Sequence, residues 1–229
     1  MSLSTLNAPA TSRNGERSTG PNRRAVLIVG LVAAALTLAL NPGWVRDIRD
    51  QFIPKRWGVV EPGKIYRSGQ ISARLIRPML EDNRIARVVD LTTDDIPEAY
   101  HDAEIETITD MGIERKLFPL ISDGTGDVET YAAAVASVAE AERQGKPVLV
   151  HCAAGTQRTG GVIATYRLLV QKKAPAEVLE EMRKYKYDPV HSPRLREYLN
   201  EHMPELASEL VRHGTIDQVP EPLPRLPTD

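Results

Sequence analysis

The chain has 229 residues, of which 41% are hydrophobic and 26% charged, with a formal net charge of −2. This is enough apolar material for one core of about 150 residues, and the near-neutral charge argues against nucleic acid as a partner. With one cysteine and five histidines, none of them at ligand spacing, we expect no metal site and no cofactor.

An apolar segment near the N-terminus follows a polar leader, residues 1–24, that we expect to be disordered. Residues 25–40 (AVLIVGLVAAALTLAL) carry no charge, and they reach the length of a spanning helix, about 20 residues, only if the next five residues extend them. We therefore predict a transmembrane anchor over residues 25–45, or a cleavable signal peptide with Thr37 and Ala39 near its cleavage site. Because arginines dominate the leader, the positive-inside rule predicts a single-pass cell-membrane protein whose remaining chain lies on the non-cytoplasmic side.

After a charged linker at residues 46–56, strand-like and helical patterns alternate, which is typical of an α/β domain. We expect one domain over residues 57–212, with a single central sheet flanked by helices. The expected strands are 58–66 (strand or hairpin), 86–91, 113–119 and 147–151. The expected helices are 72–81, 97–111, 128–143, 159–171, 175–184 and 193–212. The proline-rich tail, residues 213–229, is expected to be disordered.

The most informative segment is HCAAGTQRTG, residues 151–160, which connects the last expected strand to the next helix. A loop that turns from a strand into a helix directs successive backbone N–H groups inward, and the helix adds its unpaired N–H groups and the positive end of its dipole. This arrangement favours a phosphate group. Arg158 follows with a planar guanidinium that can bind two phosphoryl oxygens at once.

Cys152 lies under these donors, and such surroundings lower the pKa of a thiol from about 8.5 to between roughly 3.5 and 7.5. A thiolate at neutral pH could attack phosphorus as a nucleophile. Thr159 is placed to donate its hydroxyl to the sulfur and to ease its departure in a second step. We expect His151 to order the loop by hydrogen bonding and not to transfer the reaction's protons.

His151, Cys152, five further residues, Arg158 and Thr159 resemble the HCxxxxxR[ST] signature of the cysteine-dependent protein tyrosine phosphatase superfamily. The resemblance extends to KIYRSGQ and RVVDLT and covers roughly residues 57–205, as in compact bacterial and atypical dual specificity phosphatases. It implies hydrolysis of phosphomonoesters through a cysteinyl-phosphate. The implied substrate is protein phosphotyrosine, either alone or together with phosphoserine and phosphothreonine. The residues that would bind the phosphate are Ala153, Ala154, Gly155, Thr156, Gln157 and Arg158.

The same resemblance implies an aspartic acid on a movable loop upstream of the cysteine, which protonates the leaving oxygen. Asp123 precedes Cys152 by 29 positions (152 − 123), close to the family's usual spacing, and neighbouring glycines give its loop freedom to close. Asp127 is the alternative, although it also fits the N-cap of the following helix. We assign the acid role to Asp123.

The variable residues of the loop bear on the substrate and on the partners. They include no lysine, whereas relatives that act on highly phosphorylated inositols often carry lysines there, so we expect a phosphorylated protein or a small phosphomonoester of modest charge. The alternatives are an inositol phosphate or phospholipid phosphatase, and a weakly catalytic module that binds phosphorylated ligands. Arg67 is expected to stabilise the loop from outside and not to reach the phosphate. No sequence pattern fixes the oligomeric state.

Overall fold

The computed structural model describes residues 22–40, 42–93 and 98–228. The chain divides into two compact units, residues 1–46 and 47–229. Most of the leader that was expected to be disordered, residues 1–21, lies outside the described residues, and so does Pro97, where a helix was expected to begin.

The predicted transmembrane anchor is wrong. No helix in the described part of the chain is long and apolar enough to cross a membrane. The helix over the apolar run, α1 (Arg23–Leu40), begins with two arginines, and its other 16 residues would span only about 24 Å of a hydrocarbon layer about 30 Å thick. The prediction relied on the next five residues, but a separate helix, α2 (Pro42–Asp50), begins there.

Two further expectations depended on that anchor and are corrected with it. The single-pass cell-membrane location, with the remaining chain outside the cytoplasm, has no helix to support it in the described residues. The same holds for the membrane as a partner through the N-terminal helix. Part of the expected linker is also helical, since α2 continues to Asp50.

The second unit contains a five-stranded sheet in the order β1-β2-β5-β3-β4, as expected for an α/β domain. The strands are β1 (Gly58–Glu61), β2 (Ile65–Ser68), β3 (Arg87–Asp90), β4 (Glu114–Leu117) and β5 (Val148–His151). Only β1 and β2 pair antiparallel, as a hairpin, whereas β2, β5, β3 and β4 are parallel. In this register Ser68, His151 and Asp90 end three neighbouring strands side by side. The loops that follow these strands therefore meet at one edge of the sheet.

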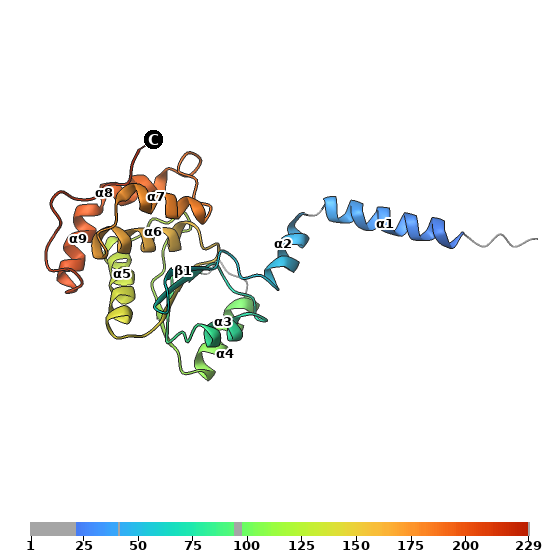
Figure 1. Ribbon diagram of the computed structural model, residues 1–229, viewed down its shortest axis with the longest axis horizontal. Coiled ribbons are helices and arrows are strands. Elements are labelled where there is room, and N and C mark those ends of the chain that lie inside the picture. The colour runs from blue at the N-terminus through green and yellow to red at the C-terminus, as the bar shows by residue number, and fades with distance from the viewer. Residues whose placement is uncertain (1–21, 41, 94–97, 229) are drawn as a thin grey trace, which may run out of the picture. The chain divides into compact units, whose positions relative to one another are not determined.

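Helices cover both faces of the sheet (Figure 1). One face carries α3 (Ile76–Asp82) and α4 (Glu98–Asp110), which contribute Leu80 and Ile108 to the smaller of two buried clusters. The larger cluster includes residues of every helix on the other face. These are α5 (Val128–Arg143), α6 (Gln157–Thr165) with its π-helical continuation η1 (Tyr166–Val170), α7 (Pro175–Lys184), α8 (Arg194–Glu201) and α9 (Met203–Arg212).

The C-terminal part of the domain differs from the prediction in two places. The single helix expected over residues 193–212 is two helices that meet at His202, because Pro204 has no N–H for a continuous helix and fits a first turn. The tail also packs on the domain instead of being disordered. Leu226 is buried, and the Asn200 side chain hydrogen-bonds both its N–H (2.8 Å) and its carbonyl oxygen (2.9 Å).

Candidate active site

The segment between β5 and α6 forms a loop at the carboxyl edge of the sheet. We call residues 152–158 the nucleophile loop. Three of its carbonyl groups accept hydrogen bonds from outside the loop: Ala153 from Gln70 N (3.1 Å), Ala154 from Arg56 Nη1 (2.6 Å) and Gly155 from Arg67 Nη2 (2.8 Å). In a trans peptide the N–H points opposite to the carbonyl. The next N–H groups therefore face the interior of the loop and form an anion-binding concavity.

Two glycines let the loop approach the end of β2 closely. Gly155 has a φ of +75°, and a Cβ there would lie 2.4 Å from the backbone nitrogen of Gly69. A Cβ on Gly69 would lie 2.7 Å from the carbonyl oxygen of Ala154. Neither position has room for a side chain, so both glycines are needed for the loop to pack as it does.

Arg67 stabilises the loop from below. Its side chain is fully buried, hydrogen-bonds the Gly155 carbonyl and lies over the Tyr185 ring at 3.9 Å from the centroid. Burial lowers the pKa of Arg67 to about 10, so the guanidinium remains charged at neutral pH. This contact agrees with the role expected from the sequence, in which Arg67 supports the loop and does not reach the phosphate.

The Cys152 thiol lies inside the loop and is 1% exposed. Its Sγ accepts a hydrogen bond from Gly155 N at 3.1 Å. Burial raises the pKa of this thiol, but the hydrogen bond from the Thr159 hydroxyl, the charge of Arg158 and the backbone N–H groups of Thr159 and Gly155 outweigh burial and lower it overall. These groups stabilise the thiolate relative to a free cysteine, which is the direction that the sequence analysis expects.

Arg158 and Thr159 enter the site from the first turn of α6. The Arg158 side chain is buried, and its Nη1 lies 3.4 Å from the carbonyl oxygen of Leu91, just after β3. The Thr159 hydroxyl lies 3.4 Å from the Ser68 carbonyl oxygen in addition to its bond with the sulfur. The N-terminus of α6 thus directs a guanidinium, a hydroxyl and unpaired N–H groups at one point.

Behind the nucleophile loop, His151 lies in a buried network of charges. Its Nε2 is 2.9 Å from Glu104 Oε1 and 3.7 Å from Asp90 Oδ1. Burial lowers the pKa of His151, but the two carboxylates outweigh it and raise the pKa to about 9. His151 is therefore protonated at neutral pH. Its ion pairs with Glu104 and Asp90 hold it in place directly before Cys152.

Among the residues that the structure describes, Asp90, Glu104 and His151 form a cluster that could hold a metal ion, with ligand atoms within 4.8 Å of one another. Their donors and acceptors are already engaged. Asp90 accepts hydrogen bonds from Thr92 and Arg115, Glu104 accepts one from Gln70, and His151 holds its proton. The cluster is organised as an ion pair with hydrogen bonds, and a metal ion bound there would have to displace the His151 proton.

The two candidate acids lie on the segment between β4 and α5. Asp123 accepts hydrogen bonds from the backbone N–H (3.0 Å) and hydroxyl (2.7 Å) of Thr125, and its Oδ2 lies 3.2 Å from Arg194 Nε. Burial raises its pKa, but these partners outweigh burial and lower it. Asp127 caps α5 by accepting from Thr130 N (2.8 Å), which lowers its pKa.

The loop that carries Asp123 lies next to the nucleophile loop. A Cβ on Gly124 would lie 3.0 Å from the backbone carbon of Gln157, the first residue of α6. Asp127, by contrast, is committed to the start of α5. The structure therefore brings the Asp123 segment, rather than the Asp127 side chain, against the entrance of α6.

Three residues of the site gave no usable signal in the sequence: Arg56, Glu104 and Tyr185. Arg56 lies in the segment expected to be a linker, and Glu104 lies on a helix rich in charge, where a solvated carboxylate is the ordinary interpretation. Tyr185 follows α7 and contacts Arg67, which is 118 positions away (185 − 67). Only the folded chain brings these residues to the nucleophile loop.

Comparison with known proteins agrees with this geometry. The model of the dual specificity phosphatase catalytic domain matches residues 65–204. Dual specificity protein phosphatase TpbA of Pseudomonas aeruginosa (strain UCBPP-PA14) is 29% identical over 161 residues, covering 70% of this chain and 67% of TpbA. The chain thus spans about two thirds of that relative's length.

Solved structures show the same fold. A crystal structure of a cysteine-to-serine variant of P. aeruginosa TpbA in complex with pTyr has a TM-score of 0.53 at 22% identity, covering 69% of this chain and 95% of the crystallised TpbA chain. The core catalytic domain of the PP-IP phosphatase SIW14 from S. cerevisiae, in complex with citrate, has a TM-score of 0.55 at 18% identity, covering 75% and 97%. Because the family model matches more than half of the chain and includes the nucleophile loop, the chain belongs to the dual specificity phosphatases, which are cysteine-dependent enzymes of the protein tyrosine phosphatase superfamily.

Proposed function

We propose that this protein hydrolyses phosphomonoesters of proteins, phosphotyrosine first, through a cysteinyl-phosphate on Cys152. The observation that carries the proposal is a buried thiol with a lowered pKa inside a loop whose carbonyl groups are all turned outward at Ala153, Ala154 and Gly155. A thiolate nucleophile and an anion-binding concavity at the same point are the two requirements of this chemistry.

In the first step the Cys152 thiolate attacks phosphorus, and the bond from phosphorus to the ester oxygen breaks. The backbone N–H groups of residues 153–157 and the Arg158 guanidinium bind the phosphoryl oxygens and stabilise the charge of the transition state. Asp123 gives its proton to the leaving oxygen as that bond breaks. The position of Gly124 beside Gln157 supports this assignment, because it places the loop that carries Asp123 next to the residues that bind the phosphate.

In the second step a water molecule attacks the cysteinyl-phosphate, Asp123 accepts its proton, and the thiolate leaves. The Thr159 hydroxyl, hydrogen-bonded to the sulfur, stabilises the departing thiolate. The products are the dephosphorylated hydroxyl and inorganic phosphate. Gln157, at the start of α6, is a candidate for orienting the water.

The substrate class rests on the charge of the loop. Ala153, Ala154, Thr156 and Gln157 add no positive charge to Arg158, which suits a monoester more than a polyanion. The related TpbA has been crystallised with pTyr. SIW14 is described as a PP-IP phosphatase, so an inositol phosphate is the second candidate.

The test is to trap the intermediate and to rank the substrates. Rapid acid quench of the full chain with a radiolabelled phosphotyrosyl peptide should yield phosphate bound to protein, and Cys152→Ser should abolish both this label and turnover while peptide binding persists. Initial rates for phosphotyrosyl and phosphoseryl peptides and for an inositol phosphate then rank the substrates. Peptide binding without turnover of any ester would show a phospho-ligand binding module, and a preference for the inositol phosphate would overturn the proposed substrate.

A further inference from the structure

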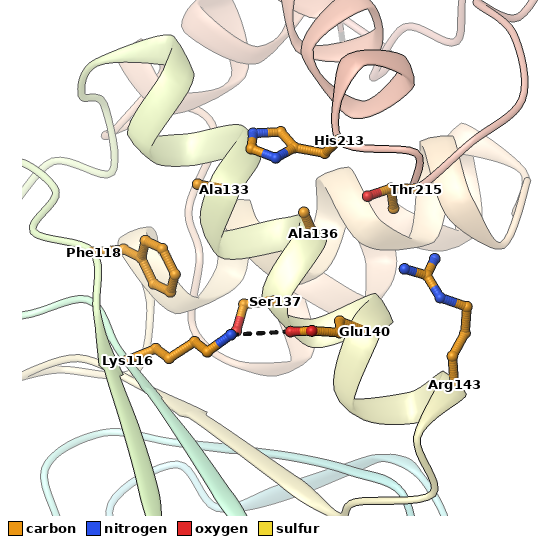
Figure 2. A pocket seen from close by; sticks show the side chains of 9 residues that line it. All are labelled: Lys116, Phe118, Ala133, Ala136, Ser137, Glu140, Arg143, His213 and Thr215. Atoms are coloured by element: carbon orange, nitrogen blue, oxygen red, sulfur yellow. Dashed lines mark hydrogen bonds and ion pairs between the residues drawn. The ribbon is translucent and has the colours of Figure 1, made fainter.

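A second cavity of about 330 Å³ lies between β4, α5 and the segment after α9, and none of its lining residues belongs to the nucleophile loop. Figure 2 shows α5 forming its floor, with Lys116 of β4 and Phe118, just after β4, on one side and the residues after α9 on the other. A cavity of this size is at the lower end of the range for small-molecule sites.

The floor of the cavity is apolar. Ala133 and Ala136, on successive turns of α5, line it together with the ring of Phe118. Both alanines are only partly buried, so their methyl groups are available for contact. A small hydrocarbon group or an aromatic ring could lie on this surface, where it would lose contact with water.

The charges around this floor sum to an excess of positive charge. Lys116 Nζ lies 3.0 Å from Glu140 Oε2, and the same carboxylate is 2.8 Å from Arg87 Nη1. The one carboxylate that lines the cavity is therefore neutralised by its own partners. Arg143 also lines the cavity, and among the described residues it forms no ion pair or side-chain hydrogen bond. Its guanidinium is thus available for an anion.

Two hydroxyl groups at the cavity have no hydrogen-bond partner. Ser137 is 5% exposed, and its Oγ and the Thr215 Oγ1 are both buried without a partner among the described residues. Figure 2 shows Thr215 at the same end of the cavity as Arg143, and Ser137 beside the Lys116–Glu140 ion pair. A buried hydroxyl without a partner costs about 1–3 kcal/mol, so a turn of the Thr215 side chain that lets its hydroxyl donate to a ligand oxygen in the cavity is favoured.

We propose that this cavity binds a small organic carboxylate with an apolar body. The carboxylate would pair with the planar guanidinium of Arg143 and accept from the Thr215 hydroxyl, while the apolar body lies on Ala133, Ala136 and Phe118. Among the lining side chains, Lys116 and Arg143 against Glu140 leave one positive charge in excess, which matches a monoanion, and a guanidinium pairs with both oxygens of a carboxylate. This site is separate from the phosphatase centre and does not depend on the reaction proposed there.

The probe is benzoate, which has one carboxylate and one ring, titrated into the full chain carrying ¹³C-methyl alanine. The signals of Ala133 and Ala136 should shift with benzoate and much less with benzyl alcohol, which has a similar ring and no charge. The shifts should persist when orthovanadate occupies the nucleophile loop. Arg143→Gln should weaken benzoate binding about fivefold, whereas the exposed Arg225→Gln should leave it unchanged.

A second variant tests the apolar part of the site. Ala136→Leu narrows the cavity and should reduce the benzoate shift of Ala133, with the fold checked by circular dichroism and by activity toward an aryl phosphate. The proposal is overturned if benzoate leaves both alanines unmoved, if benzyl alcohol binds equally well, or if orthovanadate abolishes the shifts. It is also overturned if Arg143→Gln binds benzoate as tightly as the unaltered chain.

Discussion

The nucleophile loop and the loop that carries Asp123 are neighbours, but they are held in very different ways. The nucleophile loop is fixed by buried hydrogen bonds from residues far away in the sequence, such as Arg67 with Gly155. Asp123 is held by Thr125, within its own loop, and by Arg194, whose side chain is 74% exposed. Buried partners fix a geometry far more firmly than exposed ones. The proposed phosphate-binding part is thus preorganised, and Asp123, the proposed proton donor, is held less firmly.

The largest expected effect on stability comes from a change in the nucleophile loop. Gly155→Ala should destabilise the domain by about 4 kcal/mol, because it combines a positive φ with a Cβ 2.4 Å from a backbone nitrogen, and it should abolish activity. Gly63→Ala is the matched control, with a φ of +72° and no atom within 4 Å, and should cost only about 1 kcal/mol. Urea unfolding measures both. Equal costs would show that the close approach of the loop to β2 contributes nothing.

The buried charges behind the loop should make stability depend on pH. The folded pKa of His151 is raised to about 9 from an unfolded value near 6.5. The stabilisation, about 3 kcal/mol, is therefore fully present below pH 6.5 and is lost as the pH rises through 9. In urea unfolding, Glu104→Gln should reduce the fall of the free energy of unfolding between these two pH values. The control Glu106→Gln changes an exposed residue of the same helix and should retain the fall, and an unchanged slope in Glu104→Gln would contradict the assignment.

On the movable loop, Asp123→Asn should slow hydrolysis of phenyl phosphate about a hundredfold but hardly affect dinitrophenyl phosphate, whose leaving group needs no proton. The asparagine oxygen can still accept from Thr125, so the turn is kept. Asp127→Asn also preserves its cap on α5 and should behave like the unaltered chain with both esters. The opposite result would transfer the acid role to Asp127.

The pH profile of kcat/KM gives a second test of Asp123 as the general acid. Reaction requires the Cys152 thiolate together with protonated Asp123, and both pKa values are lowered. We therefore expect an optimum on the acidic side, with a fall at higher pH as Asp123 loses its proton. This fall should disappear in Asp123→Asn, and its persistence there would assign it to another group.

The smallest expected effect comes from the exposed ion pair between Arg194 and Asp123. Arg194→Gln removes a charge that lowers the pKa of Asp123, so the fall of kcat/KM at high pH should move slightly upward. Because exposed pairs contribute less than about 1 kcal/mol, the rate should change less than about threefold and the midpoint of urea unfolding should hardly move. A large loss of stability would show that Arg194 fixes the loop more firmly than its exposure implies.

The sequence by itself determined the family and the class of the fold, and it predicted the residues of the site. The order of Cys152, Arg158 and Thr159 between a strand and a helix depends on local chain geometry, which short-range patterns report well. The alternation of strands and helices likewise predicted a central sheet. The prediction of a transmembrane anchor was wrong because α1 does not continue past Leu40 and a separate helix begins at Pro42.

Only the tertiary structure decided how the loop is held. Arg56 is separated from Ala154 by 98 positions, and Glu104 joins the site through His151, on another element. No sequence periodicity predicts such a partner. It is needed because a charge or a carbonyl group is buried, and that burial arises only when the chain folds. The same holds for the tail, whose proline-rich sequence shows no helical or strand periodicity that predicts burial. Leu226 is buried only because Asn200 and the core provide a surface for it.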